Sequence, residues 1–247
     1  MDPLFDFTGK IALVTGGSRG LGYQIVKALA ERGADVIVAS RKLDNCETVA
    51  AECRALGRRA LAHSVHCGRW AEIDAMIERV YAEFGRIDIL FNNAGMSPSC
   101  PSDEVTEQLF DSVLNLNYKG PFRLATQVAK RMAAGEGGAI INVSSTGSLM
   151  AAPMIVPYSS GKAALNAMSV SLAKEYAPKV RVNTLMPGPF LTDIADAWDP
   201  TKRETAANAA GRPGQPEEIV TAALALASPR SGYITGALYQ VDGGMRG

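Results

Sequence analysis

The sequence predicts a single-domain α/β fold, in which a doubly wound parallel sheet of about seven strands is flanked by helices. Three observations lead to this prediction. Short runs of apolar and β-branched residues alternate with longer segments of helical periodicity. Those runs are apolar on both faces, as in a sheet that helices cover on both sides. No linker, repeat or low-complexity tract divides residues 1–247, a length at which a chain buries roughly 70–75% of its unfolded surface.

The predicted strands are short, and the runs KIALVT and DVIVAS are the clearest of them. The complete set spans residues 10–15, 35–40, 59–64, 88–92, 139–144, 180–185 and 237–241. Because helices separate consecutive strands, we expect right-handed crossovers between parallel neighbours.

Six longer segments place apolar residues at helical spacing. They span residues 21–32, 43–56, 69–84, 106–133, 158–176 and 216–227. A glycine follows each of the first three segments, at Gly33, Gly57 and Gly85. Glycine at this position is typical of a helix end, so these residues support the predicted boundaries.

Composition argues against several classes of partner. Lys and Arg number 25 and Asp and Glu also number 25, so the sequence lacks the basic character expected for nucleic acid or an anionic membrane. The N-terminus has no signal-peptide pattern, and no apolar run approaches the roughly 20 residues that span a bilayer. The four cysteines show no CxxC spacing. We therefore expect a cytoplasmic protein with reduced thiols and without a metal site.

A glycine-rich turn with the sequence TGGSRGLG, residues 15–22, follows the first predicted strand and opens the first helix. There, free N–H groups and the positive end of the helix dipole face an anion such as a pyrophosphate. Gly16 allows the sharp turn, Gly20 lets the backbone approach phosphates, and Gly22 permits close packing of helix on sheet. The expected dinucleotide contacts are Gly16, Ser18, Arg19, Gly20 and Leu21. On these residues alone, a tight loop without a ligand stays open as the alternative.

The end of the second predicted strand indicates which dinucleotide binds. An NAD site usually has an acidic residue there that accepts hydrogen bonds from the ribose hydroxyls. This chain instead has Ser40 and Arg41. Arg41 and Arg19 can clamp a 2′-phosphate through charge-assisted hydrogen bonds, and Ser40 can donate another. We expect NADP(H) in preference to NAD(H), with two solvated surface arginines as the alternative.

Four polar residues between positions 117 and 162 can carry proton transfer. Tyr158 and Lys162 lie four residues apart at the start of a predicted helix, so they share one of its faces. Ser145 comes just after the fifth predicted strand, at the carboxyl edge where ligands bind in such sheets. Asn117 lies inside the long fourth helical segment. A nearby ammonium group lowers the pKa of a tyrosine, although a YxxxK pair alone is common on helix surfaces.

Taken together, these motifs resemble the short-chain dehydrogenase/reductase family over nearly the whole chain. The matching pieces are residues 15–22, 92–95 (NNAG), Asn117, Ser144 with Ser145, Tyr158 with Lys162, Pro187 and Gly188 with Thr192, 233–236 (YITG) and 241–244 (VDGG). The resemblance implies a single-domain Rossmann fold and an enzyme that transfers hydride between a nicotinamide and a carbonyl carbon.

The resemblance also implies four catalytic roles. Tyr158 exchanges a proton with the substrate oxygen, and Ser145 forms a hydrogen bond with that oxygen. Lys162 binds the nicotinamide ribose and lowers the pKa of Tyr158. Asn117 positions a water molecule that connects Lys162 with bulk solvent.

Further cofactor contacts follow from the same resemblance. Asn93, Ala94 and Gly95 are expected to line the adenosine ribose. The nicotinamide end is expected to contact Pro187, Gly188, Phe190 and Thr192. The chain departs from the family after the third strand, where Asp-Val is usual and His66 and Cys67 stand here. The adenine contact is therefore expected to use backbone groups or the His66 ring.

The segment 190–214 is expected to form a substrate lid. Its apolar residues, with others from neighbouring loops, favour an uncharged and largely apolar carbonyl compound. The residues concerned are Phe190, Ile194, Ala197, Trp198, Met96, Met150, Met154 and Ile155. The alternative is that they only pack the lid onto the domain.

Two other functions and an assembly state belong to the same set of expectations. A 3-oxoacyl-acyl-carrier-protein reductase would dock its acidic carrier on Lys130, Arg131 and Lys174, with ordinary charges on a helix surface as the alternative for these residues. A regulatory protein that binds NADP(H) without turnover usually lacks a catalytic residue, and here all four are present. The family usually forms tetramers, and the apolar faces of segments 106–133 and 158–176 suit a homotetramer interface.

Overall fold

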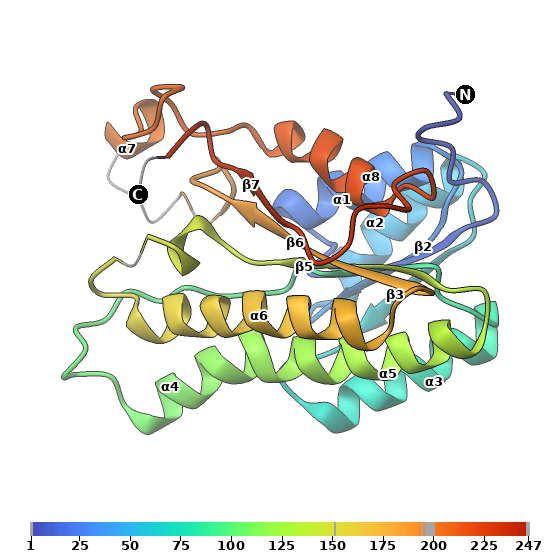
Figure 1. The fold of residues 1–247 in the computed structure, drawn as a ribbon, viewed down its shortest axis with the longest axis horizontal. Coiled ribbons are helices and arrows are strands. Elements are labelled where there is room, and N and C mark those ends of the chain that lie inside the picture. The colour runs from blue at the N-terminus through green and yellow to red at the C-terminus, as the bar shows by residue number, and fades with distance from the viewer. Residues whose placement is uncertain (1, 151, 194, 196–200, 246–247) are drawn as a thin grey trace.

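The computed structural model describes residues 2–150, 152–193, 195 and 201–245. It has three layers, with a central sheet between two layers of helices (Figure 1). The strands are β1 (Ile11–Thr15), β2 (Asp35–Ser40), β3 (Ala60–Ser64), β4 (Ile89–Asn92), β5 (Gly138–Val143), β6 (Val180–Pro187) and β7 (Leu238–Val241). All pairs are parallel, and the order across the sheet is β3-β2-β1-β4-β5-β6-β7. The seven predicted strands are confirmed to within two residues at each end.

Eight α-helices and three single turns of other helix types are present in the described residues. The α-helices are α1 (Gly20–Glu31), α2 (Leu43–Ala55), α3 (Trp70–Phe84), α4 (Glu107–Leu114), α5 (Gly120–Ala134), α6 (Val156–Glu175), α7 (Thr201–Glu204) and α8 (Val220–Ala227). The short turns are the π-helix η1 (Asn115–Lys119) and the 3₁₀ turns η2 (Thr146–Ser148) and η4 (Pro216–Ile219). As predicted, Gly33, Gly57 and Gly85 each follow a helix with positive φ.

Each face of the sheet carries its own hydrophobic core. On β1, Ala12 and Val14 belong to the core beneath α1, α2 and α8, whereas Leu13 belongs to the core over α3, α5 and α6. Alternate residues of a strand point to opposite faces, so a strand that is apolar throughout seals both layers. None of the described helices is both long and apolar enough to cross a membrane.

The sheet reverses its winding between β1 and β4. The chain runs outward from β1 through β2 to β3, and returns to β4 on the other side of β1. In such sheets, the crevice at the carboxyl ends of the strands next to the reversal is where ligands bind. The glycine turn after β1 and residues 92–95 after β4 both lie at this edge.

The helix predicted over residues 106–133 is confirmed, because α4, η1 and α5 follow each other without a gap from Glu107 to Ala134; the π-turn η1 within it was not predicted. The Asn117 amide leaves the helical surface and donates to the carbonyls of Val113 and Met96, at 2.9 and 2.8 Å. Close by, Gly120 packs so tightly that a Cβ there would lie 1.7 Å from the carbonyl oxygen of Cys67. The extra residue in this turn therefore aims Asn117 inward, and single π-turns of this kind recur at functional sites.

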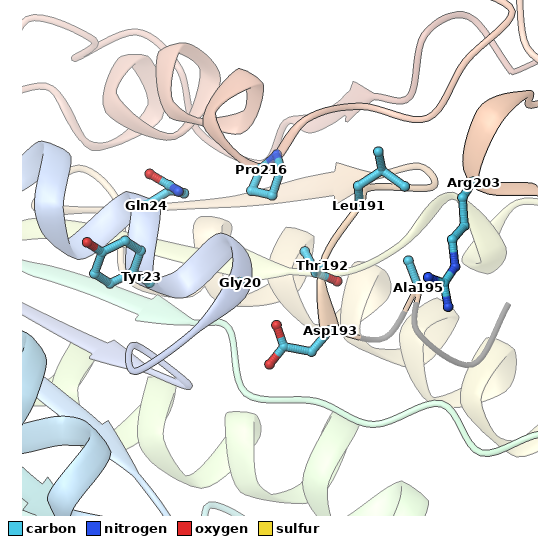
Figure 2. Close-up of a pocket in the computed structure, with 9 residues that line it drawn as sticks. All are labelled: Gly20, Tyr23, Gln24, Leu191, Thr192, Asp193, Ala195, Arg203 and Pro216. Carbon is cyan, nitrogen blue, oxygen red and sulfur yellow. The ribbon is translucent and has the colours of Figure 1, made fainter. Parts of the chain in front are cut away.

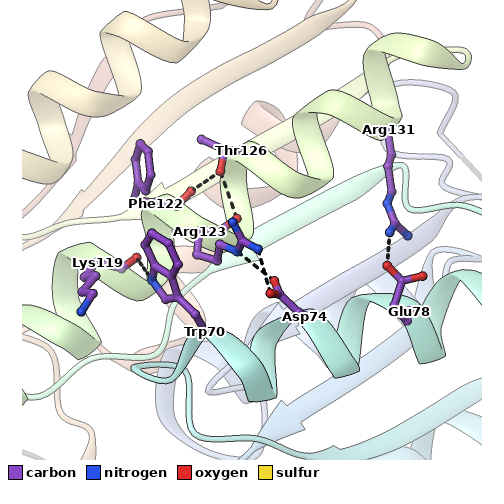
Figure 3. Close-up of polar contacts among 8 residues, drawn as sticks. All are labelled: Trp70, Asp74, Glu78, Lys119, Phe122, Arg123, Thr126 and Arg131. Atoms are coloured by element: carbon purple, nitrogen blue, oxygen red, sulfur yellow. Dashed lines mark hydrogen bonds and ion pairs between the residues drawn. The ribbon is translucent and has the colours of Figure 1, made fainter.

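Contacts between α3 and α5 hold the turn from the other side (Figure 3). The Trp70 indole donates to the carbonyl of Lys119, the last residue of η1, at 3.2 Å. Arg123 lies 4.8 Å from the Trp70 ring centroid and forms two hydrogen bonds with Asp74, at 2.8 and 2.7 Å. These interactions fix the direction in which α5 leaves η1.

Candidate active site

The glycine turn after β1 has the backbone conformation that an anion-binding loop needs. Gly16 and Gly20 have φ angles of 65° and 55°, which side-chain-bearing residues rarely adopt. The Thr15 hydroxyl accepts hydrogen bonds from the backbone N–H groups of Asn93 and Ala94, at 3.0 and 3.2 Å. The turn is thereby fixed against the end of β4.

Asn93 and Gly22 have structural tasks in this turn. The Asn93 amide donates to the carbonyls of Thr15 and Gly16, at 3.0 and 3.2 Å, so its side chain braces the turn. A Cβ at Gly22 would lie 2.2 Å from the carbonyl oxygen of Gly16 and 2.5 Å from Asn93 Nδ2. Gly22 thus permits close packing within the turn, whereas the prediction concerned packing of helix on sheet.

The cationic residue of the turn has a partner in the predicted lid. The exposed Arg19, which precedes α1, forms an ion pair with Asp193 at 3.1 Å. Ser18 and Leu21 are half-buried at the same turn. Asp193 lies in the segment that follows β6, so the ion pair joins this segment to the start of α1.

The residues predicted to contact the adenosine end of the cofactor are Ser40, Arg41, His66 and Cys67. Arg41 is exposed just beyond β2, as a residue that reaches a ligand phosphate must be. The Ser40 side chain is hydrogen-bonded to that of Cys46. His66 Nδ1 accepts from the N–H of Gly68 at 3.2 Å, and the Cys67 side chain lies in the core, where burial raises its pKa to about 12. Only the backbone of Cys67 can therefore contact an adenine.

Ser145 stands at the start of η2, immediately after β5. Its Oγ accepts a hydrogen bond from the N–H of Gly147 at 3.0 Å, which orients the hydroxyl and leaves its proton to be donated elsewhere. Tyr158, in the first turn of α6, lies within hydrogen-bonding reach of this side chain. The structure therefore brings together two of the predicted catalytic residues.

The expectation that Lys162 lowers the pKa of Tyr158 is not met in this structure. Burial raises the pKa of Tyr158 above its usual value, and the hydrogen bond with Ser145 opposes that rise. The amine of Lys162 lies 5.8 Å from the Tyr158 ring centroid and donates instead to the carbonyl of Val143, at 2.8 Å. Burial also disfavours the charge of this amine and lowers its pKa to about 7.

Asn117 and Lys162 meet beside Gly95. A Cβ at Gly95 would lie 2.8 Å from Asn117 Oδ1 and 3.5 Å from Lys162 Nζ. Asn117 is fully buried, and its Oδ1 accepts from the N–H of Met96 at 3.4 Å. The π-turn η1 between α4 and α5 therefore places the Asn117 side chain next to the buried amine of Lys162.

The residues after β6 divide into two groups. Pro187 ends the strand, and the N–H of Gly188 donates to the carbonyl of Val241 at 2.9 Å, which ties the end of β6 to the end of β7. Phe190 is 6% exposed, and its ring packs on Gly214. The prediction that Phe190 offers an apolar face to a ligand is therefore wrong, because its ring closes the base of the 190–214 segment.

A cavity of about 400 Å³ lies between the start of α1 and the segment after β6 (Figure 2). It is lined by Gly20, Tyr23, Gln24, Leu191, Thr192, Asp193, Ala195, Arg203 and Pro216. This lining mixes polar and apolar residues, and none of the described residues predicted for the apolar substrate pocket is among them. Among the residues named for that pocket, Met96, Met150 and Ile155 are half-buried and Met154 is 42% exposed. Ile194, Ala197 and Trp198 lie outside the described residues.

Sequence reasoning missed two residues at this site. Asp193 pairs with Arg19, and no pattern in the sequence predicts this contact because the two residues lie 174 positions apart. Asn166 lies four residues beyond Lys162 on α6, and it is 7% exposed. Its spacing from Tyr158 and Lys162 is a signal in the sequence, because residues at intervals of four share a helix face.

Comparison with known proteins identifies the family. The sequence model of the short chain dehydrogenases matches residues 10–203. D-threitol dehydrogenase of Mycolicibacterium smegmatis is 37% identical over 248 residues, which cover 97% of this chain and 95% of that protein. The 3-oxoacyl-acyl-carrier-protein reductase of Thermotoga maritima is 33% identical over 240 residues, which cover 96% of this chain and 98% of that protein.

Solved structures agree with the sequence comparison. A blue fluorescent protein from a metagenomic library, in complex with NADPH, has a TM-score of 0.92 at 31% identity, with 98% of this chain and 100% of that chain covered. A 7α-hydroxysteroid dehydrogenase in complex with NADH has a TM-score of 0.94 at 30% identity, with 99% and 97% covered. The chain belongs to the short-chain dehydrogenase/reductase family, and it is an oxidoreductase of that family that uses a nicotinamide cofactor.

Proposed function

We propose that the protein transfers hydride between NADP(H) and the carbonyl or alcohol carbon of an uncharged, largely apolar substrate. The convergence of Ser145, Tyr158, Lys162 and Asn117 at the carboxyl edge of the sheet carries this proposal. The left-handed turn before α1 fits the pyrophosphate of the cofactor. A bound nicotinamide supplies or accepts the hydride, and the protein supplies the proton and the orientation of the substrate.

Tyr158 is the proposed acid and base. In reduction its hydroxyl gives a proton to the substrate oxygen, and in oxidation its phenolate removes one. Ser145 donates a hydrogen bond to the same oxygen, since the N–H of Gly147 already occupies a lone pair of the serine hydroxyl. Two donors therefore polarise the carbonyl before the proton moves.

Lys162 and Asn117 are proposed to connect Tyr158 with solvent. A pKa of about 7 allows the Lys162 amine to gain and lose a proton at neutral pH. The Asn117 side chain donates hydrogen bonds to the carbonyls of Met96 and Val113. Its orientation is therefore fixed, and it lies beside this amine. We assign to Asn117 the positioning of a water molecule that relays protons to Lys162.

The preference for NADP(H) rests on charge. Arg41 is exposed beyond β2, and Arg19 is exposed at the adjoining turn after β1, with no acidic residue at positions 39–42. Two guanidinium groups favour a 2′-phosphate, whereas an NAD site usually presents a carboxylate there. The solved relatives in complex with NADPH and with NADH illustrate that the family uses both cofactors.

A parallel assay with NADPH and NADH tests this proposal. Purified protein is supplied with a panel of apolar ketones, aldehydes and cyclic ketones, and with sugar alcohols in the oxidative direction. We expect turnover of apolar carbonyls and a kcat/KM for NADPH at least about tenfold above that for NADH. Binding of NADP(H) without turnover of any substrate would favour the non-catalytic regulatory function instead.

A second candidate is reduction of 3-oxoacyl groups on a carrier protein, which the Thermotoga maritima relative favours. Of the residues expected to dock an acidic carrier, Lys130 and Lys174 are exposed. Arg131 already forms an ion pair with Glu78 on α3 (Figure 3). It also lies over the Tyr81 ring, 4.5 Å from the ring centroid. A 3-oxoacyl thioester that is reduced much faster than free ketones would support this candidate.

We also propose a homotetramer. The outer face of α6 exposes the small residues Ala163 and Ala167 together with Val156, and α5 exposes Phe122. These surfaces suit close approach of helices between subunits. Light scattering should give a mass near four times 26.1 kDa, and a monomer at micromolar concentration would contradict the assembly.

A further inference from the structure

Helix α6 contacts the turn that carries Ser145 through a buried polar side chain. Tyr158, Lys162 and Asn166 follow each other at intervals of four residues, so they lie along one face of α6. The Asn166 amide Nδ2 donates to the Ser148 hydroxyl at 2.8 Å. Ser148 lies in η2, three residues after Ser145.

The Ser148 hydroxyl that accepts this hydrogen bond is itself hydrogen-bonded to the backbone of Ser145. It donates to the carbonyl oxygen of Ser145 at 2.6 Å, and the N–H of Ser148 donates to the same oxygen at 3.0 Å. A hydroxyl that accepts one hydrogen bond and donates another has a fixed proton position, and each bond strengthens the other. The Asn166 donor occupies a lone pair of the Ser148 oxygen, and the Ser145 carbonyl at 2.6 Å is a nearer and stronger acceptor for the Ser148 proton than the Met186 sulfur at 3.7 Å.

Asn166 retains a feature that packing alone does not explain. It is 7% exposed, and its Oδ1 has no hydrogen-bond partner among the described residues. Burying an unpartnered acceptor destabilises a fold, so an apolar residue of similar size would pack this position better. The donor Nδ2 is the part of the side chain that the site uses.

We propose that Asn166 is a positioning residue of the active site, which acts through Ser148 to hold the Ser145 hydroxyl opposite Tyr158. This inference rests on the proposed function. Helix α6 then positions both groups that bind the substrate oxygen. It carries Tyr158 itself, and it positions Ser145 through the contact of Asn166 with Ser148. Displacing a group at a reacting centre by a fraction of an ångström is enough to slow catalysis.

Substitutions at Asn166 separate positioning from packing. Asn166→Leu removes the donor, and the isosteric Asn166→Asp replaces it with an acceptor that turns the Ser148 proton away from Ser145. We expect kcat to fall about tenfold in both variants, with the KM for NADP(H) within about twofold of the wild-type value. We expect the melting temperature of Asn166→Leu to stay equal to or above that of the wild type, because the orphaned acceptor is removed.

Two further variants complete the kinetic test. Ser148→Ala should reproduce the loss in kcat, and combining it with Asn166→Leu should add little, because both act through one chain of hydrogen bonds. The matched control is Thr48→Ala on the exposed side of α2, whose hydroxyl forms a hydrogen bond within its own helix, to the Asp44 carbonyl at 3.0 Å. It should leave kcat unchanged.

The pH profile of alcohol oxidation gives a second readout. Ser145 is the group whose hydrogen bond lowers the pKa of Tyr158, so losing its position should move the basic limb to higher pH. Among the residues that the structure describes, the charged group that faces Tyr158 is Lys162 on the same helix, while η1 contributes the uncharged Asn117 and η2 no charged residue. Asn166→Leu and Ser148→Ala add no charge and leave Lys162 in place, so a shift in either variant reports on Ser145. Asn166→Asp is not used for this readout, because its carboxylate would lie one turn from Lys162 on the same face of α6.

Crystal structures of the wild type and Asn166→Leu decide the proposal independently of turnover. We expect the Ser145 Oγ to move away from the Tyr158 hydroxyl in the variant. A wild-type enzyme that is active while Asn166→Leu keeps its kcat, pH profile and Ser145 position would overturn this inference and leave the proposed function intact. An inactive wild type would overturn the proposed function, and an unmoved Ser145 would then still contradict the positioning role.

Discussion

The Nζ of Lys162 donates a hydrogen bond to the carbonyl oxygen of Val143 at a distance of 2.8 Å. This bond ties the helix that carries Tyr158 to the end of β5, directly before the turn that carries Ser145. The amine is nearly fully buried, and burial lowers its pKa to about 7. The protein thus keeps a group that exchanges protons near neutral pH in the place where the proposed reaction needs one.

Lys162→Met should change stability in a pH-dependent way. The unfolded chain holds this proton up to its ordinary pKa of 10.5, whereas the folded chain releases it near 7. Burial of the charged amine therefore opposes folding fully below about pH 7, and the penalty declines as the pH rises toward 10.5. Calorimetry at about pH 6 should show the variant melting a few degrees above the wild type, and at about pH 9 the difference should shrink. A difference that does not vary with pH would contradict the lowered pKa.

Gly22→Ala should disable the cofactor turn. A Cβ at this position would lie 2.2 Å from the carbonyl oxygen of Gly16, so the turn must shift. We expect a lower melting temperature and a Kd for NADP(H) raised at least about tenfold, measured by fluorescence titration. The control is Gly232→Ala, because a Cβ there has no neighbour within 4 Å and Gly232 has no positive φ. Equal effects of the two substitutions would contradict the steric explanation.

Arg41→Ala should weaken the binding of NADPH and leave the binding of NADH almost unchanged. Loss of a charge-assisted hydrogen bond to the 2′-phosphate should raise the KM for NADPH about tenfold and leave that for NADH almost unchanged. Arg79→Ala on the exposed side of α3 serves as the control, since Arg79 pairs with Glu83 far along that helix. If NADPH and NADH respond equally to Arg41→Ala, the guanidinium does not read the phosphate.

Asp193→Asn should strengthen NADPH binding. Asp193 holds Arg19 in an ion pair at 3.1 Å, and a carboxylate competes with a phosphate for the same guanidinium. We expect the KM for NADPH to fall about threefold at low ionic strength, with a smaller effect at high salt because both groups are exposed. An increase in the KM for NADPH would instead assign Asp193 a role in holding Arg19 in place for the ligand.

The sheet was predictable from the sequence because a strand that is buried on both faces consists almost entirely of apolar and β-branched residues. Such a run can be recognised without knowing the tertiary structure. The π-turn around Asn117 was not predictable in the same way. Apolar residues continue at helical spacing on both sides of it, so the sequence predicts an unbroken helix, and only tertiary contacts with Met96 and with Cys67 near Gly120 select the π-turn. Tertiary structure overrides local periodicity at such sites.

The candidate site shows the same division. The motifs in the sequence predict Ser145, Tyr158 and Lys162 as catalytic residues, and the three side chains lie close together in the structure. The sequence could not reveal the raised pKa of Tyr158, which depends on burial, or the burial of Phe190, which depends on Gly214 being its neighbour. Both depend on residues distant in the chain, which periodicity and motif spacing do not report.

Steady-state kinetics and cofactor binding of Tyr158→Phe test the central claim most directly. The substitution removes only the phenolic oxygen and keeps the ring that packs in the first turn of α6. We predict that kcat falls by about 10³-fold or more, because general acid–base catalysis is lost, while the Kd for NADP(H) changes less than about threefold. Full turnover by this variant would contradict the account, because proton transfer would then not depend on Tyr158.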